Sequence, residues 1–178
     1  SKMKLKYLKT QIQPHFFFNT LNNLYALSLE SSNKVPDVII KLSKLMEYVL
    51  YDIEDTKFVP LIKEIDYIQN YIEIEKLRFE NVEVSINLES NIDEVKVPPL
   101  LLISFLENAF KHGGVNKNEF EIVNNLLLST NKKEKKGIGL TNTKKRLKLI
   151  FKKKYKLEQQ VKFNFYIIRL QIPLSNED

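Results

Sequence analysis

Hydrophobic residues in the first third of the chain recur at the spacing of an α-helix. The positions that share this spacing before the first turn are Leu5, Leu8, Ile12, Leu21, Leu24 and Leu27. They predict a helix over residues 4–30 that is bent or interrupted near Pro14, because proline lacks a backbone N–H group. A second amphipathic helix is predicted over residues 38–50, after the turn ESSNKVPD. Two such helices form an antiparallel hairpin whose apolar face needs a partner. We therefore expect a homodimer with a four-helix bundle.

The periodicity changes in the rest of the chain. A third helix is predicted from residue 61 to about residue 79, and alternation in VEVSINLES predicts a half-buried strand. VPPLLLISFLENAFKHGG predicts a helix that starts after a proline pair and stops at the glycines. The remaining segments predict, in order, a short strand (EFEIV), a loop (NNLLLSTNKKEKK), a helix (LTNTKKRLKLIFKKK) and one terminal strand (VKFNFYIIRLQIPL). This half is α+β, with helices on one face of a mixed sheet.

Composition narrows the class of protein. The chain of 178 residues is long enough for one domain, or for a compact domain with a helical extension, and 43% of its residues are hydrophobic. No apolar run approaches the 18 or so residues that a membrane span requires, and no signal peptide is visible. The absence of cysteine excludes disulfides and thiolate metal sites.

The net charge of +6 is a local feature. Residues 132–156 contain twelve Lys or Arg and a single acidic residue, Glu134, whereas acids outnumber bases in the rest of the chain. Such a cluster is most often a solvated face and less often an anion or nucleic-acid site. Only Phe151 and Tyr155 interrupt it, which is too few aromatic side chains to predict base stacking.

His15 is one of only two histidines, and it lies directly after Pro14 in QIQPHFFFNTLNNL. A histidine on a helix either packs or acts as a nucleophile through a ring nitrogen. Phe16, Phe17 and Phe18 surround most of the helix, so at least one ring is expected near the outside. That excess apolar surface favours docking of another domain beside His15.

Two further segments suggest phosphate chemistry. In ENAFKHGG, Glu107 and Lys111 share one helix face, and Asn108 and His112 share another. An amide oxygen and a carboxylate suit hydrated Mg²⁺, although an ordinary surface ion pair has the same spacing. In KGIGLTNTKKRL, Gly137 and Gly139 precede a helix, where unhindered backbone amides favour phosphate. Gly-x-Gly alone is weak evidence because plain turns also contain it.

Taken together, the three segments resemble the sensor histidine kinases of the LytS/YehU type. LKTQIQPHFFFNTLNNL resembles that family's phosphoacceptor box, VPPLLLISFLENAFKHG its N box, and GIGLTNTKKRL its G box. PLIKEIDYIQNYIEIEKLRF resembles the segment that joins the two halves of the family's catalytic region. The resemblance covers nearly the whole chain with the motifs in the family's order.

This resemblance implies a fold and a reaction. Residues 1–56 would form the dimerisation and phosphoacceptor hairpin, and residues 57–178 an α/β-sandwich ATP-binding domain of the gyrase/Hsp90/histidine-kinase type. His15 would be autophosphorylated by ATP and would pass the phosphoryl group to an aspartate in the receiver domain of a response regulator. Glu107 would polarise the histidine or a water, and Asn108 would ligate Mg²⁺. The residues implied at the ATP site are Asn108, Lys111, His112, Asn124, Gly137, Gly139, Leu140 and Asn142.

The resemblance also implies a cellular setting. Family members usually carry an N-terminal membrane sensor region, so this chain is expected to be the cytoplasmic portion of a membrane-anchored protein. The expected partners are a second copy of the chain, ATP and the response regulator. No direct nucleic-acid binding and no membrane contact of this fragment are expected.

Two departures from the family pattern bear on function. Asn124 in IVNNLL stands where the family usually has the aspartate that accepts a hydrogen bond from the adenine amino group. An asparagine oxygen still accepts that bond, but without the charge. Only a few residues separate Gly114 from Glu119, where the family fits another strand, so either the sheet is one strand short or residues are missing there. The alternative function is therefore an ATP-binding scaffold of the same fold without kinase activity.

Overall fold

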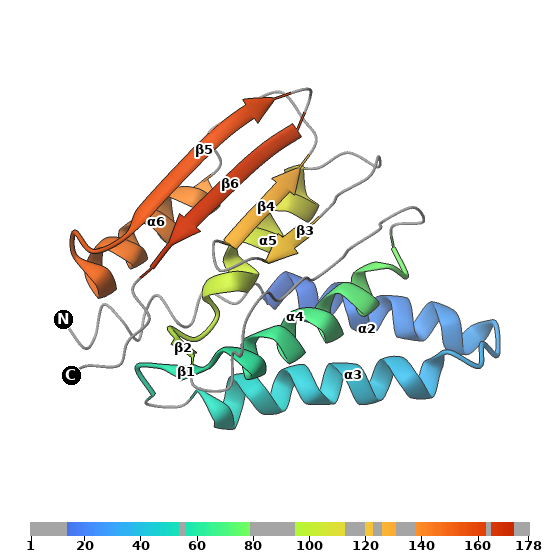
Figure 1. Cartoon of the computed structure of the whole chain (residues 1–178). Helices are drawn as coiled ribbons and strands as arrows, with labels where there is room; N and C mark the ends of the chain where they lie inside the picture. The colour runs from blue at the N-terminus through green and yellow to red at the C-terminus, as the bar shows by residue number, and fades with distance from the viewer. Residues whose placement is uncertain are drawn as a thin grey trace.

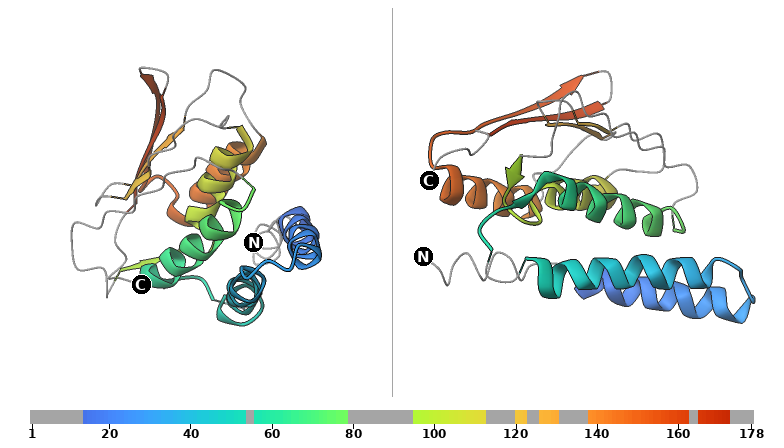
Figure 2. Two further views of the ribbon diagram at one scale, coloured as in Figure 1. Left: turned by 90° about the vertical axis from the view of Figure 1, so that its right-hand side faces the viewer. Right: turned by 60° about the horizontal axis from the view of Figure 1, so that its bottom comes forward.

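The computed structural model describes residues 14–53, 56–78, 95–112, 120–122, 126–130, 138–162 and 165–172. Figures 1 and 2 show a layered arrangement: a sheet, a middle layer of helices, and outer helices on the side of that layer away from the sheet. The helices of the middle layer cover one face of the sheet, as the sequence predicts. The chain is therefore mixed α+β.

The outer pair consists of α2 (Pro14–Leu29) and α3 (Val35–Glu47), which lie side by side. Ser31 adopts a left-handed conformation with φ of 52°, and the Ser32 amide donates to the Leu27 carbonyl at 3.0 Å, which ends α2. Both helices are where the apolar periodicity predicts them. The part of the first predicted helix that precedes Pro14 lies outside the described residues. A π-helical turn, η1 (Tyr48–Asp52), follows α3 and was not predicted.

The helix of the middle layer that lies next to the outer pair is α4 (Leu61–Glu75). Its buried residues extend beyond one helical stripe because α4 contacts α3 on one side and α5 on the other. A short antiparallel pair of strands, β1 (Val59–Pro60) and β2 (Lys96–Val97), joins the start of α4 to the segment before α5.

Two further helices complete the middle layer, α5 (Leu101–His112) and α6 (Ile138–Phe151), and they pack against each other. Pro98 and Pro99 precede α5, as predicted from the proline pair. Gly139 lies inside the first turn of α6, so the prediction that both glycines precede this helix is wrong for Gly139. The helix begins at Ile138, two residues before Leu140, where the apolar pattern placed its start.

The four-stranded sheet has the order β3-β4-β6-β5, and its strands are β3 (Phe120–Ile122), β4 (Leu126–Thr130), β5 (Lys156–Lys162) and β6 (Phe165–Gln171). Every pairing among these described strands is antiparallel. A mixed sheet would need a parallel neighbour, and the predicted strand VEVSINLES lies outside the described residues. That prediction therefore stays a prediction.

Two predictions about the sheet are wrong. The segment predicted as a loop contains β4, which pairs with β3 on one side and with β6 on the other. Three successive leucines in β4 conceal the alternation that marks a half-buried strand, whereas a strand inside the sheet tolerates a continuous apolar run. The single terminal strand is a hairpin of two strands. Its extra strand, β5, lies at the sheet edge, where a polar sequence such as KLEQQVK is tolerated.

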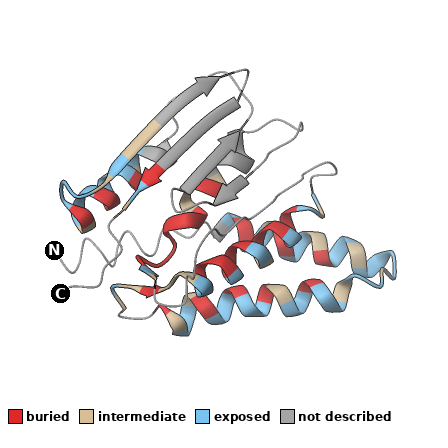
Figure 3. Cartoon of the chain, in the orientation of Figure 1, coloured by how far each residue is buried: buried red, intermediate tan, exposed pale blue. Residues whose placement is uncertain are grey.

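One hydrophobic core runs through the outer and middle helices (Figure 3). Leu45 of α3, Ile74 of α4, Leu101 of α5 and Leu147 of α6 have no exposed surface. The outer pair is thus packed against the rest of the chain through α4. The domain boundary predicted at residue 56 stays a prediction.

Candidate functional site

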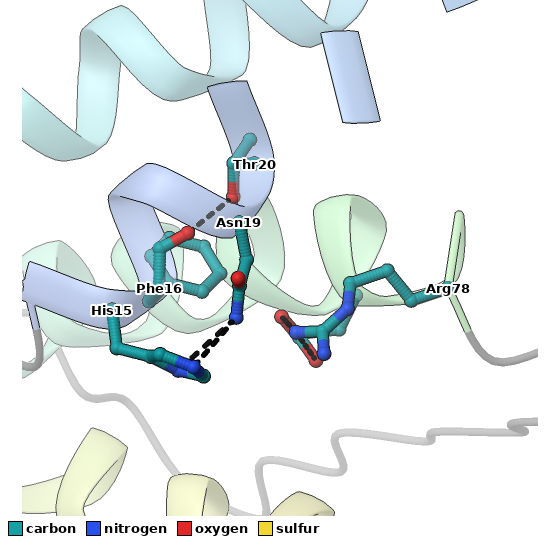
Figure 4. A network of polar contacts seen from close by, with 6 residues as sticks. His15, Phe16, Asn19, Thr20 and Arg78 are labelled. Atoms are coloured by element: carbon teal, nitrogen blue, oxygen red, sulfur yellow. Dashed lines mark hydrogen bonds and ion pairs between the residues drawn. The ribbon is translucent and has the colours of Figure 1, made fainter. Parts of the chain in front are cut away.

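His15 lies in the first turn of α2 and is exposed. The Asn19 side chain, one turn later, places its amide nitrogen 3.1 Å from Nδ1 and 3.3 Å from Nε2 of His15 (Figure 4). An amide nitrogen only donates, so it pairs with whichever ring nitrogen lacks a proton. The exposed imidazole therefore has one polar partner among the described contacts, an amide donor from its own helix.

The next residue, Phe16, is fixed in the core. It is 5% exposed, and its ring stacks on Tyr71 of α4 with a centroid separation of 4.5 Å. The Thr20 hydroxyl donates to the Phe16 carbonyl at 2.8 Å, so the polar atom of this buried threonine is satisfied within α2. Phe18 is 65% exposed, which confirms the prediction that at least one of the three rings lies near the outside.

Two charged residues, Glu75 and Arg78, form an ion pair at the C-terminal end of α4. Arg78 donates from Nη1 to both carboxylate oxygens of Glu75, at 3.2 and 3.5 Å. Burial raises the pKa of Glu75, and the Arg78 guanidinium opposes that rise. Figure 4 shows Asn19 between His15 and Arg78. The guanidinium of Arg78 is therefore paired with Glu75, and the amide of Asn19 is the donor that contacts the imidazole.

Glu107 of α5 approaches the same region from the other helix layer. Burial is the main cause of the raised pKa values of Tyr67 and Tyr71, and the negative charge of Glu107 adds to both. Since Tyr71 also stacks on Phe16, this tyrosine lies between the segment that carries His15 and the helix that carries Glu107. The structure thus relates two of the predicted catalytic residues through one buried ring.

The other predicted site residues are placed only in part. The predicted Mg²⁺ ligand Asn108, together with Lys111 and His112, lies on α5, and Gly139 and Leu140 lie in the first turn of α6; the structure describes their backbone only. Asn142 of α6 is half-buried. Asn124 and Gly137 lie outside the described residues. Because α5 and α6 are packed together, the two predicted nucleotide-binding segments lie on neighbouring helices.

Sequence reasoning did not find Glu64, a carboxylate that is 1% exposed in α4. The backbone amides of Leu100 and Leu102 donate to its two oxygens at 2.6 and 3.3 Å, and the Tyr48 hydroxyl of η1 donates to Oε1 at 2.5 Å. Burial raises the pKa of Glu64, while these donors and the charge of Arg146 oppose the rise. The signal was available in the sequence. The segment before α5 has no residue that caps a helix, so an acceptor must come from elsewhere.

Arg146 of α6 completes this buried network. It is 6% exposed and donates to the carbonyl oxygens of Leu100, at 3.2 Å, and of Pro99. Leu100 itself has a left-handed backbone with φ of 58°. The turn before α5 is therefore held through its amides by Glu64 and through its carbonyls by Arg146.

No described group of three or more His, Cys, Asp or Glu side chains could hold a metal ion. Hydrated Mg²⁺ needs few protein ligands, so the pair Glu107 and Asn108 on α5 is compatible with it by donor chemistry. In the same described part of the chain, no helix is long and apolar enough to span a bilayer.

Sequence comparisons agree with the motifs. A family model described as histidine kinase matches residues 3–82. The sensor protein LytS of Oceanobacillus iheyensis is 33% identical over 111 residues, which are 62% of this chain and 19% of that protein. The sensor histidine kinase/phosphatase LytS of Staphylococcus aureus is 32% identical over 117 residues, 65% of this chain and 20% of that protein. The chain thus spans about a fifth of the length of these curated relatives.

Solved structures are similar in fold. The catalytic domain of histidine kinase ThkA has a TM-score of 0.54 at 18% identity, over 67% of this chain and 97% of that domain. The Acinetobacter baumannii histidine kinase AdeS has a TM-score of 0.51 at 14% identity, over 90% of this chain and 84% of that one. At these identities the likeness concerns the α+β fold alone.

Proposed function

Because the chain matches the histidine kinase family model over residues 3–82 and is similar to LytS sensor proteins, we propose that it is the catalytic portion of a two-component sensor kinase of the LytS type. ATP phosphorylates His15, which then phosphorylates an aspartate of a response regulator. The observation that carries the proposal is the exposed imidazole of His15 directly before the anchored Phe16, whose partner Tyr71 lies near Glu107. A nucleophile that must meet two different partners in turn needs this exposure.

The chemistry requires an unprotonated ring nitrogen. Its lone pair attacks the γ-phosphorus of ATP, the bond from that phosphorus to the β–γ bridging oxygen breaks, and ADP leaves. The proton on the other ring nitrogen is then shed, for which Glu107 is the proposed acceptor. Asn108 would hold Mg²⁺, which supplies charge neutralisation on the phosphates when bound. The rest of the proposed ATP site consists of Lys111, His112, Asn124, Gly137, Gly139, Leu140 and Asn142.

The polar surroundings of His15 suit the product of this step. Asn19 donates toward the imidazole, and in the view of Figure 4 the guanidinium of Arg78, which is paired with Glu75, lies beyond Asn19. A phosphoryl group on His15 carries negative charge, which a nearby amide donor and guanidinium stabilise. We propose that these two residues orient the imidazole and balance the charge.

Labelled ATP tests the proposal. The chain is incubated with Mg²⁺ and ATP labelled in the γ-phosphate, beside His15→Ala, Asn108→Ala and the matched control Asn33→Ala, an exposed asparagine in the turn after α2. We expect acid-labile, alkali-stable label on the wild type and the control, and none on the other two. Equal label on His15→Ala overturns the assignment of the nucleophile. Saturable ATP binding without label would instead support the ATP-binding scaffold, which the asparagine at position 124 motivates.

We further propose that the outer helix pair dimerises. Exposed apolar side chains form a stripe on each helix: Phe18, Leu21, Tyr25 and Leu29 on α2, and Ile39 and Met46 on α3 with Leu50 on η1. Two copies of these stripes would bury each other in a four-helix bundle. Leu21→Asp is expected to shift the sedimenting species from dimer to monomer, and an unchanged dimer would contradict this interface.

We place the chain on the cytoplasmic side of the membrane, where ATP and the response regulator are available.

A further inference from the structure

We infer that Glu64 is a positioning residue of the kinase, and that its hydrogen bond from Tyr48 couples the hairpin bearing His15 to the helices of the ATP site. The inference rests on the proposed function. The observation behind it is one buried carboxylate that accepts hydrogen bonds from the end of α3 and from the start of α5. Neither Glu64 nor Tyr48 belongs to the motifs to which the phosphoryl chemistry is assigned.

The first step is the capping of α5. A helix begins with backbone amides that have no partner within the helix, and these need acceptors when they are buried. Pro98 and Pro99 offer no capping side chain and no amide hydrogen. Glu64 supplies both of its oxygens instead, to Leu100 and to Leu102. The position of α5, and with it Glu107 and Asn108, therefore depends on where α4 holds this carboxylate.

The second step is the attachment of α6. Arg146 donates to the carbonyls of Pro99 and Leu100, in the same turn whose amide binds Glu64. The helix that begins in the predicted glycine segment and the helix that carries Asn108 thus share one anchor. A shift of the turn moves both helices together.

The third step is the link to the hairpin. Tyr48 is 5% exposed, and its hydroxyl lies 2.5 Å from Oε1 of Glu64. Its ring lies 5.0 Å from that of Tyr67 in α4, so packing alone would accommodate a phenylalanine. The hydroxyl adds a directional bond between η1 and the cap of α5. Single π-helical turns occur frequently at functional sites, and this one turns Tyr48 toward α4 at the point where α3 ends.

The expected consequence is a change in rate and not in ATP affinity. Loss of the Tyr48 hydroxyl leaves the proposed nucleotide contacts on α5 and α6 unaltered. Loss of this hydroxyl removes the hydrogen bond between η1 and the Glu64 carboxylate that caps α5. The distance between His15 and the bound phosphate is then expected to vary more. Phosphoryl transfer is sensitive to such positioning, because displacements of about 1 Å have large effects on rate.

The experiment compares Tyr48→Phe and Glu64→Gln with Tyr51→Phe. Tyr51 lies on the same π-helical turn but is 72% exposed, so its variant removes a hydroxyl without touching the network. Three quantities are measured on the chain: the kcat and KM of autophosphorylation, the Kd for ATP, and amide hydrogen exchange at Leu100 and Leu102. For Tyr48→Phe we expect kcat about tenfold lower, a Kd within about twofold of wild type, and faster exchange at both amides. Glu64→Gln should have the larger effects, and Tyr51→Phe none.

The outcomes separate this inference from the proposed function. A wild-type chain that binds ATP but is never labelled refutes the kinase and with it the catalytic role of Glu64. An active wild type whose Tyr48→Phe variant keeps its kcat overturns the inference alone. Equal losses in kcat and in ATP affinity show a structural role only and also overturn it. Because Tyr48→Phe preserves the ring, the test stands even if Glu64→Gln does not fold.

Discussion

Glu64 and His15 are both titratable side chains on helices, yet their surroundings are opposite. Glu64 is 1% exposed and accepts hydrogen bonds from η1 and from the start of α5. His15 is exposed, and the described hydrogen bonds to its ring come from a single side chain of its own helix. The fold thus saturates one group with internal partners and leaves the other for partners from outside.

This difference in burial indicates a structural role for Glu64 and a chemical role for His15. A buried carboxylate with fixed donors holds elements in place, because each bond that it loses leaves an unsatisfied buried group. An exposed imidazole contributes little to stability but can meet ATP and then a receiver domain. Strong perturbation by burial therefore marks the framework of this chain, and exposure marks the proposed nucleophile.

The first prediction concerns the free energy of unfolding. Glu64→Ala removes the acceptor for the start of α5 and for the Tyr48 hydroxyl, so we expect a loss of about 4 kcal/mol. His15→Ala changes an exposed side chain and should stay within about 0.5 kcal/mol. Urea denaturation followed by circular dichroism measures both. Similar losses in the two variants would remove the basis of the comparison.

The second prediction compares a buried and an exposed aromatic residue that are two positions apart on α2. Phe16 is 5% exposed and stacks on Tyr71, so Phe16→Ala should cost about 3 kcal/mol by leaving a cavity. Phe18 is 65% exposed, and Phe18→Ala should cost less than about 0.5 kcal/mol when the chain is dilute enough to be monomeric. The same denaturation measurement applies. A large loss for Phe18→Ala in the monomer would mean that this ring packs within its own chain.

The helices were predictable because apolar periodicity and turn residues agree there. α2, α3, α4 and α5 all lie where spacing, prolines and polar turns indicate them. β4 was missed because Leu126, Leu127 and Leu128 leave no alternation to detect. β5 was missed because an edge strand needs few apolar residues. β4 also pairs with β6, which is distant in the sequence, whereas β5 pairs with the adjacent β6 in a hairpin.

In the candidate site, too, some residues could be predicted from the sequence and others could not. His15 and Glu107 follow from short motifs, since the chemistry needs particular residue types at fixed spacing. The buried network could not be predicted because it joins Tyr48, Glu64 and Arg146 from three separate elements. Only the missing cap before α5 signalled it, and that signal does not say which element supplies the acceptor. Local motifs thus indicate reactive groups, while tertiary contacts determine what positions them.

The third prediction compares two ion pairs at the end of α4 with the same i, i+3 spacing. Arg78→Ala leaves the buried carboxylate of Glu75 without this partner, so we expect a loss of about 1.5 kcal/mol. Lys76→Ala removes a pair with Glu73 in which both side chains are largely exposed, and should cost about 0.3 kcal/mol. Thermal unfolding of both variants tests the difference, and equal losses would contradict the role of burial.

The fourth prediction uses pH to isolate the charge of Glu64. Burial raises its pKa above the ordinary 4.5, so the folded chain keeps this proton at pH values where the unfolded chain has lost it. The free energy of unfolding must then fall as pH rises through the interval between the two values, by at most about 1.4 kcal/mol per pH unit. Glu64→Gln cannot titrate at this position. The stability of the wild type relative to this variant should therefore decrease as pH is raised from about 4.5, in urea denaturation series. An increase instead would show that the Tyr48 hydroxyl, the two backbone amides and Arg146 together outweigh the cost of burying the charge.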